Sequence, residues 1–85
     1  MRDANLNHAT LKAANLQEAS LYGTVLRSAD LTNANLRSAD LRYADLTHAN
    51  LQGADLTNAQ LEFAIMPDGK TYSGNWQWHL AEPNH

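Results

Sequence analysis

A leucine recurs at every fifth residue from Leu6 to Leu61, and the series continues at Met66. On an α-helix each step of five residues turns by about 140°, so these side chains would spread over every face. On a β-strand successive side chains alternate between the two faces, so neighbouring leucines would point to opposite sides. Neither element buries the leucines together. A chain that turns in the same direction at each pentad does, because every leucine then faces one central axis.

The pentads share more than their central residue. Alanine stands two places before the centre in twelve of thirteen pentads, and Thr24 is the exception. The place directly before the centre is mostly Asn or Asp, whose side chains bond nearby backbone and tolerate unusual dihedral angles. We therefore expect the alanines to face inward and the Asn and Asp residues to support tight turns. The predicted core ladder consists of Leu6, Leu11, Leu16, Leu21, Leu26, Leu31, Leu36, Leu41, Leu46, Leu51, Leu56, Leu61 and Met66.

The tandem pentads "ADLTN", "ANLRS", "ADLRY" and "ANLQG" follow the pattern A-[DN]-L-x-x and resemble the pentapeptide-repeat family. The resemblance covers residues 4–66, about three-quarters of the chain. It implies an all-β fold, a right-handed quadrilateral β-helix with four pentads to a coil and with the Leu and Ala inward. Thirteen pentads then make about three coils, a short solenoid. The "MPDGK" that follows the repeats is similar to endings of short cyanobacterial members.

The remaining residues, 67–85, do not continue the repeat. "PDGK" is a turn signal, and "TYSGNWQWHL" then places Tyr72, Trp76, Trp78 and Leu80 on alternate positions. Such alternation indicates an extended segment with one apolar side. We predict a β-helix over 4–66 and a C-terminal turn and aromatic capping tail over 67–85. A second interpretation is that the tryptophan pair stacks on a ligand or a partner.

The opposite end of the repeat has no visible cap, since the pentads begin at Ala4. The end coils of a solenoid expose their core unless they are capped. We therefore expect Leu6, Leu11, Leu16 and Leu21 to face solvent through an open end. Burial of each leucine is worth about 1.5–3 kcal/mol. This favours a protein partner, self-association through the N-terminal coil, or closure by a preceding segment.

One wall of the expected solenoid carries aromatic residues. With four pentads to a coil, Tyr43 stacks on Phe63 and Tyr22 lies one coil away, while Arg42 and Glu62 form an exposed ion pair of little energetic value. Solvated surfaces seldom gather aromatic side chains. The wall is therefore either covered by the tail or used as a binding surface. The candidate interaction patch consists of Tyr22, Arg42, Tyr43, Glu62, Phe63, Trp76 and Trp78.

Composition and spacing exclude several classes of function. The net charge of −3 offers no basic stripe for nucleic acid, and the absence of cysteine excludes disulfides and zinc–thiolate sites. His8 and His48 share a wall, but two coils separate them by roughly 10 Å, too far for one metal ion. No nucleophile–base pair or glycine-rich phosphate loop is present. We expect no catalytic, cofactor or metal site.

The chain has no apolar run of membrane-spanning length and no apolar leader, so we expect a cytoplasmic protein unless a targeting segment has been removed. The sequence predicts a structural or protein-interaction module without catalytic activity. The alternative is a DNA-mimicking inhibitor or protector of a type II topoisomerase, similar to the quinolone-resistance members of the family. The short length and weak net charge of the chain disfavour this alternative, and Arg27, Arg37 and Arg42 interrupt any acidic stripe.

Overall fold

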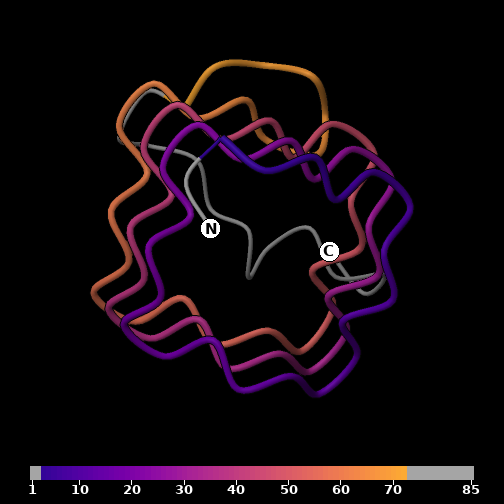
Figure 1. Ribbon diagram of the computed structural model, residues 1–85, viewed down its shortest axis with the longest axis vertical. Coiled ribbons are helices and arrows are strands. Elements are labelled where there is room, and N and C mark those ends of the chain that lie inside the picture. Colours follow the sequence, from indigo (N-terminus) through magenta and orange to yellow (C-terminus); the bar gives the residue numbers. More distant parts are fainter. Residues whose placement is uncertain (1–2, 73–85) are drawn as a thin grey trace.

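The computed structural model describes residues 3–72 of the chain. Over this range the backbone forms neither a helix nor a continuous strand, and its ladders consist of isolated β-bridges. Each parallel bridge joins the residue directly before a pentad centre to the residue twenty positions later, as Asn5 to Val25 and Val25 to Asp45. The chain therefore returns onto itself every four pentads. Figure 1 shows the successive coils superposed when the molecule is viewed along the stack.

The bridges fall into four columns, one for each wall of the coil. Each bridge is flanked by backbone hydrogen bonds: Asp30 N donates to Ala9 O of the coil below at 2.9 Å, and Leu31 N donates to Asn50 O of the coil above at 2.8 Å. A single bridge forms on each wall because the chain turns a corner after every pentad. The columns are Asn5–Val25–Asp45–Ile65, Thr10–Asp30–Asn50, Asn15–Asn35–Asp55 and Ser20–Asp40–Gln60.

Each corner is a β-turn that begins at the pentad centre. Leu36 O, for example, accepts a hydrogen bond from Ala39 N at 3.1 Å. In the pentads centred on Leu6 to Leu61, the residue two places after the centre has positive φ, with 57° at Ser38 and 56° at Ala13. Positive φ at the third turn residue alone is the signature of a type II turn, which favours glycine or asparagine there. Gly53 occupies one such corner with φ of 72°, and a Cβ there would contact the side-chain amide of Asn33.

The Asn and Asp residues before each centre support the turns, as the sequence predicts. Asn5 Oδ1 accepts a hydrogen bond from Asn7 N at 3.1 Å, and Asp45 Oδ1 accepts one from Thr47 N at 3.0 Å. These residues do not themselves adopt the left-handed backbone of the turns. They form the bridges, and left-handed backbone lies two places after the centre instead. The side chain and the strained backbone of each turn therefore belong to different residues.

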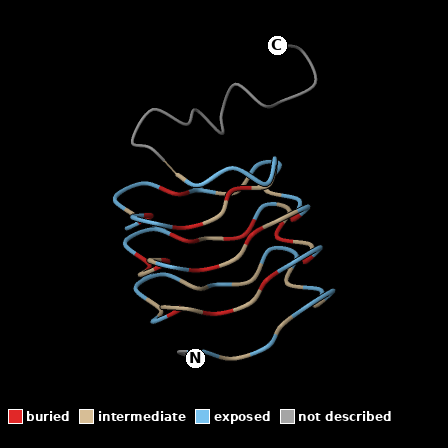
Figure 2. Cartoon of the chain, turned by 90° about the horizontal axis from the view of Figure 1, so that it is seen from above, coloured by how far each residue is buried: buried red, intermediate tan, exposed pale blue. Residues whose placement is uncertain are grey.

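The core runs along the axis of the coils and is best closed in the middle. Figure 2 shows buried stretches in the middle coils, whereas residues 3–20 are all intermediate or exposed. Thr24, the one departure from alanine, is also fully buried. The fully buried centres are Leu21, Leu26, Leu31, Leu36, Leu41, Leu46 and Met66; Leu56 and Leu61 are almost fully buried, and Leu6, Leu11, Leu16 and Leu51 are partly buried against them.

Exposure at the first coil is less extensive than the sequence suggested. Leu6, Leu11 and Leu16 are partly buried, but Leu21 is completely buried, so its predicted exposure is wrong. The start of the described chain lies against the residue that follows Leu21, because Asp3 N donates a hydrogen bond to Tyr22 O at 2.9 Å.

The predicted turn after Met66 reverses the chain. Gly69 N donates to Met66 O at 2.8 Å, and Met66 N donates to Lys70 O at 2.8 Å. An antiparallel bridge then pairs Ile65 with Thr71. The remainder of the predicted capping tail, residues 73–85, lies outside the described residues.

Candidate functional site: an aromatic cluster beside a paired arginine

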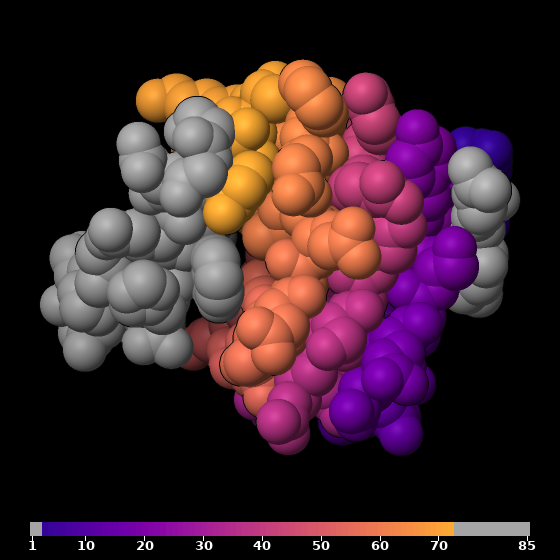
Figure 3. All heavy atoms as spheres, turned by 90° about the vertical axis from the view of Figure 1, so that its left-hand side faces the viewer, coloured from indigo at the N-terminus to yellow at the C-terminus, as the bar shows by residue number. Residues whose placement is uncertain are grey.

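Three aromatic side chains from successive coils meet on the outer surface; we call Tyr22, Tyr43 and Phe63 the aromatic cluster. The ring centroids of Tyr43 and Phe63 are 5.1 Å apart with planes 15° from parallel. The Tyr22 and Tyr43 centroids are 5.3 Å apart, with the rings tilted by 54°. Figure 3 shows how side chains of adjacent coils pack together across one outer face of the solenoid. The cluster is therefore a continuous aromatic column.

The turn geometry explains why this column projects outward. Tyr43 and Phe63 both occupy the left-handed corner position, each with φ of 63°. Because the two corners lie twenty residues apart, they fall on adjacent coils at the same corner. Tyr43 is 52% exposed and Phe63 is 60% exposed, and they are the exposed large hydrophobic residues of the described range. A rigid backbone thus holds two stacked rings in solvent.

Arg42 lies beside the cluster, but its partner differs from the expected one. Its Nε and Nη2 donate to Asp40 Oδ1 at 2.9 Å and to Asp40 Oδ2 at 2.8 Å. Its Cζ also lies 5.2 Å from the centre of the Tyr22 ring. Hydrogen bonding to Asp40 raises the pKa of the Arg42 guanidinium, and the charge of Glu62 is the weakest contribution in that direction. The expected Arg42–Glu62 ion pair is replaced by a two-pronged pair with Asp40.

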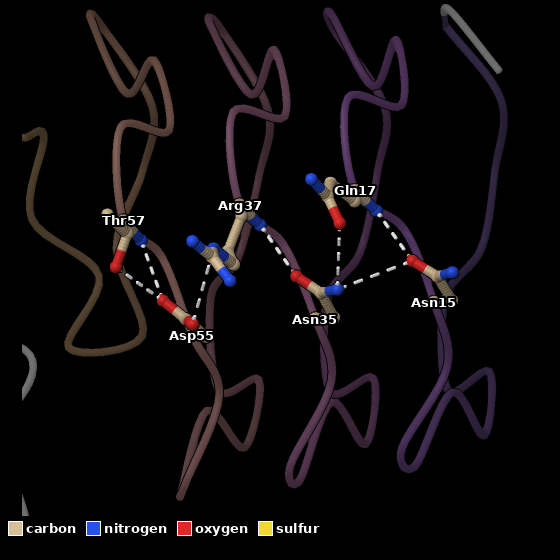
Figure 4. Close-up of polar contacts among 6 residues, drawn as sticks. All are labelled: Asn15, Gln17, Asn35, Arg37, Asp55 and Thr57. Atoms are coloured by element: carbon tan, nitrogen blue, oxygen red, sulfur yellow. Dashed lines mark hydrogen bonds and ion pairs between the residues drawn. The ribbon is translucent and has the colours of Figure 1, made fainter.

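The other two arginines of the repeat pair across coils at a spacing of eighteen residues. Arg27 Nη1 lies 3.4 Å from Asp45 Oδ2, and Arg37 Nε lies 3.7 Å from Asp55 Oδ2. The residue after one centre thus reaches the residue before a centre on the next coil. Figure 4 shows this arrangement at Arg37 and again between amide side chains, where Asn35 Nδ2 donates to Gln17 Oε1 at 3.3 Å. Sequence reasoning missed these contacts because it compared residues twenty apart.

Three aspartates before the centres are held in the charged form. Hydrogen bonds from the Thr32 hydroxyl and N–H lower the pKa of Asp30, and Thr57 acts in the same way on Asp55. At Asp45 burial is the largest influence and raises the pKa, but hydrogen bonds from Thr47 and the charge of Arg27 outweigh it, so the pKa is lowered. These carboxylates therefore act as turn acceptors.

We expect acid to weaken the solenoid through these three carboxylates. Their depressed pKa values contribute stability that is complete above the ordinary aspartate pKa of about 3.9 and is lost as pH falls through the folded-state values. The triple substitution Asp30→Asn, Asp45→Asn and Asp55→Asn removes this titration. The variant should still fold, because Asn35 Oδ1 already accepts the equivalent backbone bond from Arg37 N.

The measurement is the midpoint of thermal unfolding between about pH 7 and about pH 3 for both proteins. The wild-type midpoint should fall more steeply with acid than that of the triple variant. Equal slopes would show that these carboxylates do not couple folding to pH.

The described residues hold neither a metal-binding group nor a helix suited to cross a membrane. Among residues 3–72 no set of three or more His, Asp or Glu side chains is arranged to hold a metal ion. The same residues contain no long apolar helix that could span a bilayer. The aromatic cluster with Arg42 and Glu62 is therefore the candidate site that we consider further. Trp76 and Trp78, which the sequence assigns to the same patch, lie outside the described residues.

A comparison with protein families finds the same repeat in this chain. The model of pentapeptide repeats (8 copies) matches residues 4–42 and 34–68. The chain belongs to the pentapeptide-repeat family. The resemblance noted in the sequence is thereby confirmed, and members of this family form right-handed quadrilateral β-helices. Pentapeptide-repeat proteins are generally structural rather than catalytic.

Two solved pentapeptide-repeat proteins are similar to this one. HetL from the cyanobacterium Nostoc sp. strain PCC 7120, which is involved in the regulation of heterocyst differentiation, shares 45% identity over 85% of this chain, with a TM-score of 0.84. Rfr23 from the cyanobacterium Cyanothece 51142 shares 38% identity over 71% of this chain, with a TM-score of 0.70. The matches span 34% of HetL and 41% of Rfr23. None of the curated proteins compared with the chain matches it.

Proposed function

We propose that this pentapeptide-repeat protein is a non-catalytic structural module that binds another protein through its aromatic cluster. In this proposal the repeats form a right-handed quadrilateral β-helix of about three coils, residues 67–85 form the C-terminal turn and cap, and the protein acts in the cytoplasm. The backbone bridges at a spacing of twenty residues support the coil count. The reversal of the chain at Ile65 and Thr71 supports the cap.

The observation that carries the proposal is the exposure of Tyr43 and Phe63 on a rigid wall. Aromatic side chains supply large contact area at protein interfaces and are enriched at their centres. Here the two rings are already stacked and fixed by their turns, so little conformational entropy is lost when a partner covers them. HetL, which is similar to this chain, is involved in the regulation of heterocyst differentiation, a kind of role that a protein-binding module can fill.

The alternative, imitation of DNA to bind a type II topoisomerase, has less support. An imitation of duplex DNA needs closely spaced negative charge that is free of cations. In the repeat, Asp40, Asp45 and Asp55 each form an ion pair with an arginine. The walls that carry these pairs therefore present alternating charge.

Quantitative affinity capture from the source cells tests the proposed function. Wild-type protein is compared with the double variant Tyr43→Ser and Phe63→Ser, and with a control, Ser28→Ala, at another exposed corner. We expect at least one protein to be retained by the wild type and the control but lost with the double variant. If every captured protein binds all three baits equally, the aromatic cluster is not a binding surface. A cluster-dependent capture of the chain itself would identify self-association, which the partly buried Leu6, Leu11 and Leu16 of the first coil also permit.

A further inference from the structure

The wall that carries the aromatic cluster already holds one arginine between a ring and a carboxylate. Arg42 lies 5.2 Å above the centre of the Tyr22 ring and binds Asp40 through two hydrogen bonds of 2.9 and 2.8 Å. A guanidinium is well suited to such a place, because its flat face stacks on a ring while its edge pairs with a carboxylate. The wall thus shows which chemical group it accommodates.

The same two kinds of group recur one coil further on, at Glu62 and Phe63. Phe63 stacks on Tyr43 and is still 60% exposed, so much of its surface is available to a partner. Glu62 is an exposed neighbour of Phe63 in the chain, and it takes part in none of the ion pairs formed among residues 3–72. Arg42 is committed to Asp40. This level of the wall therefore offers a ring and a carboxylate whose nearby cation, Arg42, is paired with Asp40 and lies beyond ion-pair distance of Glu62.

We propose that Phe63 and Glu62 together bind an arginine side chain presented by a partner protein. This inference rests on the proposed function and names the chemistry of the partner at that site. The guanidinium stacks against the exposed Phe63 ring, and its N–H groups donate to the Glu62 carboxylate. Arginine is favoured over lysine because its planar group satisfies both contacts at once, whereas a lysine ammonium is a strongly hydrated point charge.

The chain provides a specific probe, because Phe63 is its only phenylalanine. The ring resonances of Phe63 are followed by NMR while a terminally blocked Gly-Arg-Gly-Arg-Gly peptide is added to the full chain. Peptides with glutamine or lysine in place of arginine serve as ligand controls. We expect saturable shifts at concentrations on the order of millimolar for the arginine peptide, with lysine weaker and glutamine without effect.

Matched carboxylate variants separate this site from general attraction to an acidic protein. Glu62→Gln should weaken binding of the arginine peptide by about threefold, the value of one exposed ion pair. Glu18→Gln removes the same charge from an exposed position on another wall and should leave binding unchanged. Both variants retain Phe63 as the reporter, and their folding is checked by the unshifted resonances of the rest of the chain.

The outcomes decide between this inference and others. Unchanged Phe63 resonances, equal effects of the glutamine and arginine peptides, or equal affinity in Glu62→Gln and wild type would each overturn it. Phe63 shifts that depend on protein concentration without peptide would overturn it in favour of a second copy of the chain. If affinity capture finds a cluster-dependent partner but the arginine peptide does not bind, the proposed function stands and this inference fails. If the arginine peptide binds but affinity capture finds no cluster-dependent partner, the arginine site stands and the proposed function fails.

Discussion

Replacement of Leu31 by alanine is expected to lower the free energy of unfolding by about 2–5 kcal/mol, the usual cost of truncating a fully buried leucine. Leu31 is completely buried and belongs to the middle coil. Its column contains Leu11 on the coil below and Leu51 on the coil above, and both of these are only partly buried. The lost methyl groups are therefore removed from the best-closed part of the core, where neighbouring coils hold the cavity open.

Leu11→Ala is the matched control, since it removes the same atoms from the same column. Leu11 has a coil on one side only within the described residues, so its truncation should cost clearly less than that of Leu31. Urea unfolding monitored by circular dichroism measures both values. Equal losses would mean that the two leucines have equal burial in solution, and would contradict the stacking order. A cost for Leu31→Ala near zero would contradict the core itself.

Valine at a corner is the second substitution with a large expected effect. Ser38 has φ of 57°, a left-handed conformation that is strained for a β-branched side chain. Ser38→Val should therefore destabilise the protein by about 2 kcal/mol. Ser38→Gly should be neutral or stabilising, because glycine adopts this conformation without strain and this gain offsets its greater freedom in the unfolded chain.

The control for this pair is Gln52→Val. Gln52 is exposed, as Ser38 is, but it occupies the preceding place of its turn and is not among the residues with positive φ. Valine there should cost well under the value at Ser38. Urea unfolding of the three variants gives the comparison. If Ser38→Val and Gln52→Val are equally stable, the left-handed corner is not part of the solution structure.

The period of the sequence was sufficient to predict the coil, because only a chain that turns at each pentad brings Leu6 through Met66 to one axis. The resemblance of the pentads to a known family supplied the number of pentads in a coil. Pairing of Asn35 with Asp55 in a parallel bridge agrees with that number. Position within the stack could not be predicted from the pattern, since Leu11 and Leu31 occupy equivalent places in their pentads and differ in burial.

The candidate site was only partly predictable, for a geometric reason. Residues twenty apart share a corner, which correctly brings Tyr43 onto Phe63. Long charged side chains, however, reach back toward the bridge column of their own pentad, either on the next coil or on their own. Arg37 therefore reaches Asp55, eighteen residues away, while Arg42 turns back to Asp40 within its own pentad. Spacing alone does not predict which of these two partners an arginine takes. Arg42, which pairs within its own pentad, also lies over the ring of Tyr22.

The central claim is that residue pairs nineteen and twenty-one positions apart are hydrogen-bonded between coils. NMR detection of scalar couplings across hydrogen bonds tests it most directly in the unmodified protein. We expect couplings from Leu36 N–H to Asp55 C=O and from Asn35 N–H to Ala14 C=O, whose nitrogen–oxygen distances are 2.8 and 2.9 Å. Couplings that instead join these amides to carbonyls one pentad nearer or farther along the chain would contradict a coil of four pentads, and with it the aromatic cluster.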